Sequence, residues 1–176
     1  MTEEQVVIGA ETKFPLNGIL TLPKENDRLL PAVVLVHGSG PNNMDEKIGN
    51  NYPFKDLAEG LSEQRIAVLR YDKRTFVYSK EMGEHPASSF LKTLNKPVFI
   101  LQGDKDFQVS IEKDFNSYRS LLNDMTHITF KRYENLNHLF MPSVYGEKLK
   151  AKKEYKVAQL VDKQVIDDVA NWILSI

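Results

Sequence analysis

The chain has 176 residues, a formal net charge of −1, a hydrophobic fraction of 41% and a charged fraction of 27%. These values describe one soluble globular domain and exclude a strong field that would attract nucleic acid or an anionic membrane. The absence of cysteine excludes disulfides, thiolate metal sites and a cysteine nucleophile. The start of the chain lacks the layout of a signal peptide, and no apolar run approaches the roughly 20 residues that span a bilayer. We therefore expect a cytoplasmic protein with no membrane or nucleic-acid partner.

The N-terminal part of the chain begins with two short apolar stretches, residues 6–8 and 18–22. A Pro-Leu-Asn-Gly turn signal at residues 15–18 separates them, so we expect a β-hairpin. After a polar connection, the run AVVLV at residues 32–36 is apolar without alternation. Such a run is typical of a strand that is covered on both faces, as in a parallel sheet.

A helix and a second buried strand are expected next. Pro53 suits a first helical turn, and apolar residues follow it at helical spacing: Phe54, Leu57, Ala58 and Leu61. Residues 66–69 form another apolar run, which predicts a strand leading into the sequence RYDKR at 70–74. Residues 75–96 are less regular and contain one expected short helix, near residues 88–94.

The C-terminal part again alternates strands with helices. We expect a strand at 97–101, a helix from Ser110 and a strand at 128–133. Apolar residues between 157 and 176 have the spacing of one amphipathic helix, and the lysine-rich run at 148–156 is expected to be solvated. Strands that alternate with helices predict an α/β domain with a mostly parallel sheet.

Polar, glycine-punctuated segments follow three of the expected strands, at residues 37–41, 103–106 and 135–138. In an open parallel sheet, ligands bind in the crevice at the carboxyl ends of the strands. An acid in the second segment and a histidine in the third have the chain order of the acid and base in Ser-His-Asp hydrolases. There the carboxylate orients the imidazole, and the imidazole moves the proton of the nucleophile.

Two parts of the sequence resemble a known family. The first contains HGSGPNNMDEKIGNNYPFKDLAEGL and IAVLRYDKR, and the second contains KPVFILQGDKDFQV, YENLNHLF and VIDDVANWI. Together they resemble bacterial serine esterases of the α/β-hydrolase, dienelactone-hydrolase-like group, over most of the chain apart from residues 75–90 and the lysine-rich run. The resemblance implies an α/β-hydrolase-like three-layer sandwich and an acyl-transfer reaction on a small-molecule ester.

The resemblance also assigns roles to individual residues. Asp106 matches the acid of the catalytic triad, and His138 matches the base. The backbone N–H groups of Ser39 and Gly40 lie where the family places its oxyanion hole. His37 belongs to the HG motif, a structural position under that loop, and Asp72 and Arg74 are expected to brace the end of their strand.

The chain departs from the family where the nucleophile should be. The family carries its serine in a G-x-S-x-G elbow between the RYDKR strand and the strand before the acid. Here only 22 residues, 75–96, join those strands, and their serines lack flanking glycines: Ser79, Ser88 and Ser89. The sequence therefore predicts one domain over residues 1–176 with an internal deletion within 75–96.

The family sheet has the strand order 1-2-4-3-5-6-7-8, so the deletion would remove strands 5 and 6. Strands 3 and 7 would then have unpaired edges, which are hazardous when exposed. We expect the remaining strands to close into one six-stranded sheet of order 1-2-4-3-7-8, because a crossover needs only a dozen or so residues.

Each of these residues also has a simpler interpretation. Asp106 alone could be a turn or capping aspartate, and His138 alone could cap a packing cluster. Ser39 could act as a substitute nucleophile, although its N–H already has a role in the family. The acidic pair Asp45 and Glu46 is expected to be solvated.

No sequence pattern points to a metal or a cofactor. There is no H-E-x-x-H or similar ligand spacing, no Walker loop and no G-x-G-x-x-G. We therefore expect no metal site and no cofactor.

Three functional hypotheses follow. The chain is a carboxylic-ester hydrolase whose lost serine is replaced, or it is a non-catalytic truncated or engineered hydrolase scaffold. The third hypothesis is an interaction protein that self-associates through exposed strand edges. The absence of the elbow favours an impaired or inactive hydrolase.

Overall fold

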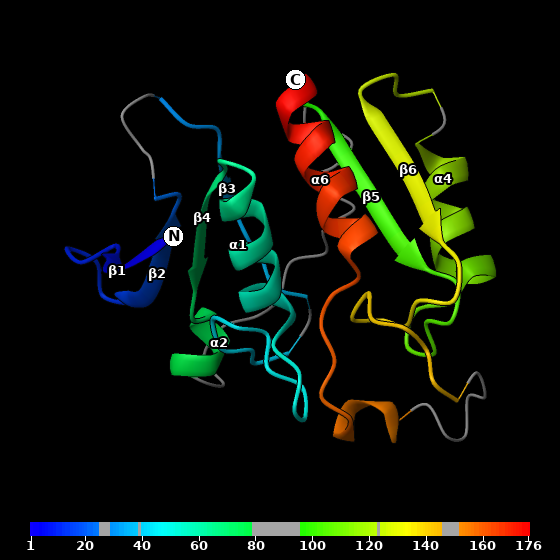
Figure 1. Cartoon of the computed structure of the whole chain (residues 1–176), viewed down its shortest axis with the longest axis horizontal. Helices are drawn as coiled ribbons and strands as arrows, with labels where there is room; N and C mark the ends of the chain where they lie inside the picture. Colours follow the sequence, from blue (N-terminus) through cyan, green and yellow to red (C-terminus); the bar gives the residue numbers. More distant parts are fainter. Residues whose placement is uncertain (25–28, 39, 79–95, 123, 146–151) are drawn as a thin grey trace.

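The computed structural model describes residues 1–24, 29–38, 40–78, 96–122, 124–145 and 152–176. Its strands form two sheets, and helices α1 and α6 lie side by side between the two groups of elements (Figure 1). The expected short helix near residues 88–94 lies outside the described residues. No helix in the described part of the chain is long and apolar enough to cross a membrane.

The N-terminal sheet has four strands in the order β1-β2-β4-β3. The strands are β1 (Thr2–Ile8), β2 (Leu16–Leu22), β3 (Ala32–Val34) and β4 (Ala67–Tyr71). The expected hairpin is confirmed, since β1 pairs antiparallel with β2. β2 is also antiparallel to β4, whereas β3 and β4 are parallel. The sheet is therefore mixed, and its order matches strands 1-2-4-3 of the expected topology.

Two helices belong to this part of the chain. Helix α1 (Pro53–Glu63) begins at the expected proline, and the short α2 (Arg74–Val77) follows β4. Residues of α1 pack with Ile66 and Val68 into one buried core. Strand β3 is shorter than the expected run at 32–36 and its exposure alternates: Val34 in it and Val36 just after it are 54% and 71% exposed. In the described part of the chain, β3 is therefore covered on one face only.

The C-terminal sheet consists of β5 (Val98–Gly103) and β6 (Ile128–Tyr133), which pair in parallel. The expected helix from Ser110 begins as a π-helical turn, η2 (Ile111–Phe115), and continues as α4 (Asn116–Leu121). The ring of Phe115 packs edge-on against Phe130 of β6, and Trp172 of α6 stacks on Phe99 of β5. Because neighbouring strand residues point to opposite faces, helices cover both faces of this small sheet.

The expected single six-stranded sheet is not what the structure shows. β3 and β5, which correspond to strands 3 and 7 of that prediction, belong to separate sheets. Helices α1 and α6 pack against each other, so helix packing joins the two parts of the fold (Figure 1). The α/β-hydrolase-like class was predicted, but the closure of the sheet was predicted wrongly.

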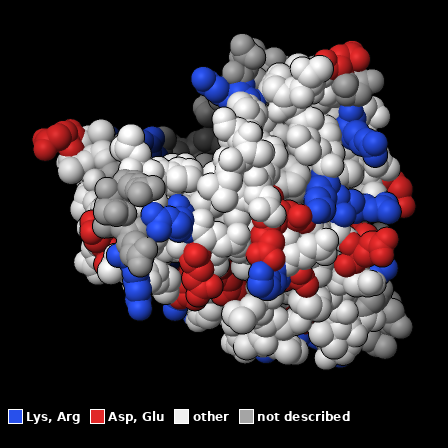
Figure 2. All heavy atoms as spheres, turned by 45° about the horizontal axis from the view of Figure 1, so that its top comes forward, with Lys and Arg blue, Asp and Glu red and all other residues white. Residues whose placement is uncertain are grey.

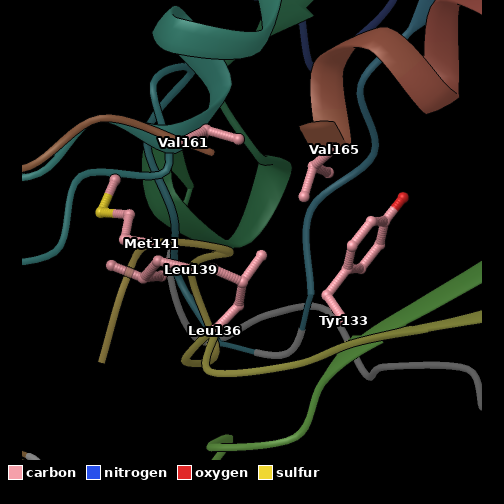
Figure 3. Close-up of a cluster of buried hydrophobic side chains, with 6 residues drawn as sticks. All are labelled: Tyr133, Leu136, Leu139, Met141, Val161 and Val165. Carbon is pink, nitrogen blue, oxygen red and sulfur yellow. The ribbon is translucent and has the colours of Figure 1, made fainter. Parts of the chain in front are cut away.

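Helix α6 (Lys163–Ser175) contributes to both hydrophobic cores. Ala170 belongs to the core around α1 and β4, and Val165 belongs to a second core at the carboxyl end of β6 (Figure 3). Figure 3 shows the second core, whose members are Tyr133, Leu136, Leu139, Met141, Val161 and Val165. The helix begins later than expected, because the Asp162 side chain caps it by accepting from the N–H of Gln164.

Candidate functional site

Asp106 lies in the turn that follows β5. Its Oδ1 atom accepts hydrogen bonds from the backbone N–H groups of Gln108 and Val109, at 2.8 and 2.9 Å. Its side chain is only 5% exposed. One carboxylate oxygen is thus committed to its own turn, and Oδ2 remains available for a partner.

That partner is His138, in the loop that follows β6. Its Nδ1 atom lies 2.8 Å from Asp106 Oδ2, and because a carboxylate oxygen only accepts, Nδ1 carries the proton in this contact. The His138 side chain is 34% exposed, and its Nε2 atom has no hydrogen bond to a described residue. The arrangement holds the imidazole in one tautomer and leaves its basic nitrogen without a partner among the described residues.

The parallel pairing of β5 and β6 brings the two loops together. Gly103 ends β5 where a Cβ atom would lie 2.3 Å from the carbonyl oxygen of Leu136, so only glycine permits this approach. The N–H of Asn135 donates to Asp104 Oδ1 at 2.6 Å, and the N–H of Lys105 donates to Leu136 O at 2.9 Å. These contacts connect the turn containing Asp106 directly to the loop containing His138.

The loop after β3 is attached to the end of β4. His37 Nε2 donates to the carbonyl oxygen of Asn43 at 2.9 Å, and burial lowers the pKa of the His37 imidazole. Asp72 accepts from the N–H of Met44 at 2.8 Å, so it braces this loop rather than its own strand alone. Lys73 Nζ donates to the carbonyl oxygen of Gly38 at 2.7 Å.

The expected oxyanion residues fall on this loop. Gly40 has a φ of +87° and its carbonyl oxygen accepts from Thr75 Oγ1 at 3.3 Å. The positive φ favours glycine at this position. Ser39 lies outside the described residues, as do Ser79, Ser88 and Ser89.

The acidic pair after this loop is not solvated as expected. Asp45 Oδ1 lies 2.9 Å from Nε of Arg70, whose side chain is 2% exposed. Burial raises the pKa of Glu46, an effect that the charges of Lys73 and His138 oppose. Glu46 is thus partly buried, and its Oε2 atom is buried without a hydrogen bond to a described residue. Sequence reasoning missed this because neighbouring loop acids are normally exposed.

Among the described residues, no group of three or more histidine, aspartate or glutamate side chains is placed to hold a metal ion. Figure 2 shows one face of the molecule, on which acidic and basic side chains lie close to one another. Neither positive nor negative charge is therefore concentrated on this face.

Comparison with known proteins agrees with this architecture. A solved structure, Est1E from Butyrivibrio proteoclasticus, superposes with a TM-score of 0.59 at 13% identity, covering 97% of this chain and 98% of that one. An alpha/beta hydrolase candidate of unknown function from Agrobacterium tumefaciens superposes with a TM-score of 0.53 at 16% identity, covering 96% and 97%. The chain has an α/β-hydrolase fold. At these identities the likeness concerns the fold alone.

The sequence comparison adds one relative. Over 62 residues the chain is 64% identical to Esterase EstD from Thermotoga maritima, so the two proteins are homologous there. The matched segment is 35% of this chain, and the chain covers only 15% of the length of that esterase. No family model matches the chain.

Proposed function

We propose that this chain carries the acid and base of a serine-esterase acyl-transfer site, with His138 as the base and Asp106 as the group that orients it. The observation that supports this best is the 2.8 Å contact between His138 Nδ1 and the 5% exposed Asp106 carboxylate. Since Nε2 has no hydrogen bond to a described residue, it is free to take a proton from a nucleophile.

In this reaction a serine hydroxyl attacks the carbonyl carbon of a small ester while His138 Nε2 removes its proton. Asp106 stabilises the imidazolium that forms, and the backbone N–H groups of Ser39 and Gly40 would hold the oxyanion. The imidazolium then returns the proton to the alcohol that leaves, and water releases the acyl group by the same steps in reverse. The homology with a protein named as an esterase supports esters as the substrate class.

The same proposal makes this chain an impaired or inactive hydrolase. No G-x-S-x-G elbow occurs in the sequence, which fits the deletion of the elbow region within residues 75–96. Loss of the nucleophile alone can lower turnover by about 10⁶. A replacement would have to come from another serine or from a partner chain.

The test is treatment with a fluorophosphonate probe followed by intact-protein mass spectrometry. We expect the mass to stay near 20.2 kDa with no adduct, or with an adduct at only a trace rate. A rapid stoichiometric adduct would contradict the impaired state, and peptide mapping would then identify the serine. Ser39→Ala would test whether Ser39 is the substitute nucleophile that the sequence suggests.

Four variants test whether labelling depends on His138 and Asp106 rather than on residues elsewhere in the fold. His138→Gln and Asp106→Asn should abolish any trace labelling. His127→Gln and Asp167→Asn should leave it unchanged, because His127 precedes β6, at the opposite end from His138, and Asp167 pairs with Lys163 on α6. Where the wild-type protein shows measurable labelling, equal labelling in all four variants would contradict the assigned roles.

One observation favours self-association as a second candidate function. Among the described residues β3 is the last strand at its edge of the four-stranded sheet, and Val34 in it and Val36 just after it are 54% and 71% exposed. Exposed apolar edge strands can pair with another chain. Light scattering over a range of concentrations tests this, with Val34→Lys expected to abolish any dimer; a monomer at all concentrations contradicts it.

A further inference from the structure

Glu154 is a buried carboxylate surrounded by hydrogen-bond donors. It lies in a single 3₁₀ turn, η3 (Glu154–Lys156), between lysines that the sequence indicates as solvated. Lys152, Lys153 and Lys156 are indeed exposed, whereas Glu154 is 1% exposed. A buried charge without a cation partner is costly, so the groups that stabilise it must be placed with care.

Both oxygens of Glu154 accept hydrogen bonds from the segment that follows β6. Oε1 accepts from Ser143 Oγ at 2.7 Å and from the N–H of Tyr145 at 2.9 Å. Oε2 accepts from Asn137 Nδ2 at 3.1 Å. Burial by itself would raise the pKa of Glu154, but these bonds and one from the backbone of Val144 outweigh burial and lower it.

Asn137 transmits this contact to the neighbouring His138. Its Oδ1 atom accepts from the N–H groups of Leu139 and Met141, at 2.9 and 3.2 Å, so its side chain spans the turn that contains His138. Leu139 and Met141 are anchored in the core shown in Figure 3. On the other side, Glu154 accepts from the amide nitrogen of Asn137, so the amide oxygen of Asn137 is the atom that faces the turn.

The next residue, Tyr155, contacts the loop of the acid. Tyr155 Oη accepts from Gln108 Nε2 at 2.6 Å, and its ring lies 5.5 Å from that of Phe107. The carbonyl oxygen of Tyr155 also accepts from the N–H of Asn50 at 3.1 Å. One short turn therefore contacts the loop of the base, the loop of the acid and the segment before α1.

We propose that Glu154 is a positioning residue for His138, acting through the Asn137 amide, and that η3 holds the two halves of the acid–base pair in register. This inference rests on the proposed role of His138. It assigns a function to a segment that lies outside the family resemblance, inside the lysine-rich run.

The experiment exchanges the two side chains that meet. Glu154→Gln puts an amide donor opposite the Asn137 amide donor, and Asn137→Asp puts two carboxylates opposite each other. In the double variant the new amide donates to the new carboxylate. The oxygen of the new amide still accepts from Ser143 and Tyr145, and the second oxygen of the new carboxylate still accepts from Leu139 and Met141. Only the double variant restores a donor–acceptor pair.

The readout is the NMR signal of the proton shared between His138 Nδ1 and Asp106, which does not require turnover. We expect this signal to be lost or broadened in each single variant and restored in the double variant. If a trace of fluorophosphonate labelling exists, its rate should fall about tenfold or more in the single variants and recover in the double one. Should a single variant not fold, the double variant alone decides, because it must fold and show the signal.

Val68→Ala is the control, because Val68 is fully buried and belongs to the other core, around α1 and β4. It should lower stability and leave the Nδ1 signal intact. An unchanged signal in Glu154→Gln, or no recovery in the double variant, would overturn the inference. Failure of the proposed function is distinguishable, since it would appear as labelling that His138→Gln and Asp106→Asn leave unchanged, while the Nδ1 signal and its dependence on Glu154 persist.

Discussion

The two parts of the molecule each depend on a buried charged residue, and the two residues are stabilised in opposite ways. Arg70 on β4 is 2% exposed and bonds to two carboxylates, Glu3 and Asp45, and to the hydroxyl of Thr21. Glu154 is 1% exposed and is stabilised by neutral donors alone among the contacts described above. The first residue ties a hairpin to a loop through ion pairs, whereas the second fixes a turn through directional hydrogen bonds.

This difference suits what each part carries. Both sets of contacts are directional hydrogen bonds, but Arg70 has opposite charges beside it, whereas Glu154 is stabilised only through the precise placement of neutral donors. The C-terminal part contains the Asp106–His138 pair, whose chemistry needs that precision. The N-terminal part contributes the loop after β3, which is braced by Asp72 and Lys73.

The largest expected effect tests whether the two parts unfold together. Leu61 in α1 is 1% exposed, and Leu61→Ala should lower the free energy of unfolding by about 2–5 kcal/mol. Trp172, the single tryptophan, stacks on Phe99 in the other part. If α6 couples the two parts, they unfold together. Urea unfolding followed by Trp172 fluorescence will then show the full loss of unfolding free energy caused by Leu61→Ala. Leu121→Ala, at a 51% exposed position of α4, is the control, and an unshifted Leu61→Ala transition would show independent parts.

A smaller loss is expected at Arg70. Arg70→Met leaves Asp45 and Thr21 without their buried partner. Because Glu3 and Asp45 are partly exposed, we expect the free energy of unfolding measured in urea to fall by about 2 kcal/mol. The Nδ1 signal of His138 should survive. Lys163→Met is the matched control, since the Lys163–Asp167 pair is exposed and contributes at most about 0.5 kcal/mol. A lost His138 signal in Arg70→Met would contradict the separation of the two networks.

The smallest effect concerns pH and should have opposite signs at two glutamates. The lowered pKa of Glu154 means that its contribution is present above the ordinary value of 4.5 and is lost as pH falls through the lowered one. The raised pKa of Glu46 means that its contribution is present below 4.5 and is lost as pH rises through the raised one. The rise of the urea midpoint with pH in the acidic range should therefore become steeper in Glu46→Gln and shallower in Glu154→Gln. Identical pH profiles of the two variants would contradict both assignments.

Local patterns predicted most elements of the fold, because periodicity and turn residues act over short distances. The hairpin, the proline-initiated α1 and the alternating β6 follow from them. The polar segments after β5 and β6 could be placed together for a similar reason, since parallel neighbours end at the same edge. Chain order and this rule predicted an acid close to a histidine, and the family resemblance assigned them to Asp106 and His138.

Features that depend on distant contacts were not accessible. The apolar run of β3 does not reveal that one of its faces is uncovered in the described structure, and strand patterns do not reveal that β3 and β5 belong to separate sheets. Glu154 is flanked by lysines, so no local signal separates it from a solvated glutamate. Its burial results from Ser143 and Asn137, which fold back over it.

The position of α6 in both cores also has a kinetic consequence. Its contacts with α1 join residues far apart in the chain, as in the hydrogen bond between Gln64 and Asp167, which are 103 positions apart. Closing so long a loop costs entropy before the contacts that reward it have formed. We therefore expect the docking of α6 on α1 to come late in folding, after each small sheet has formed its own strand pairs.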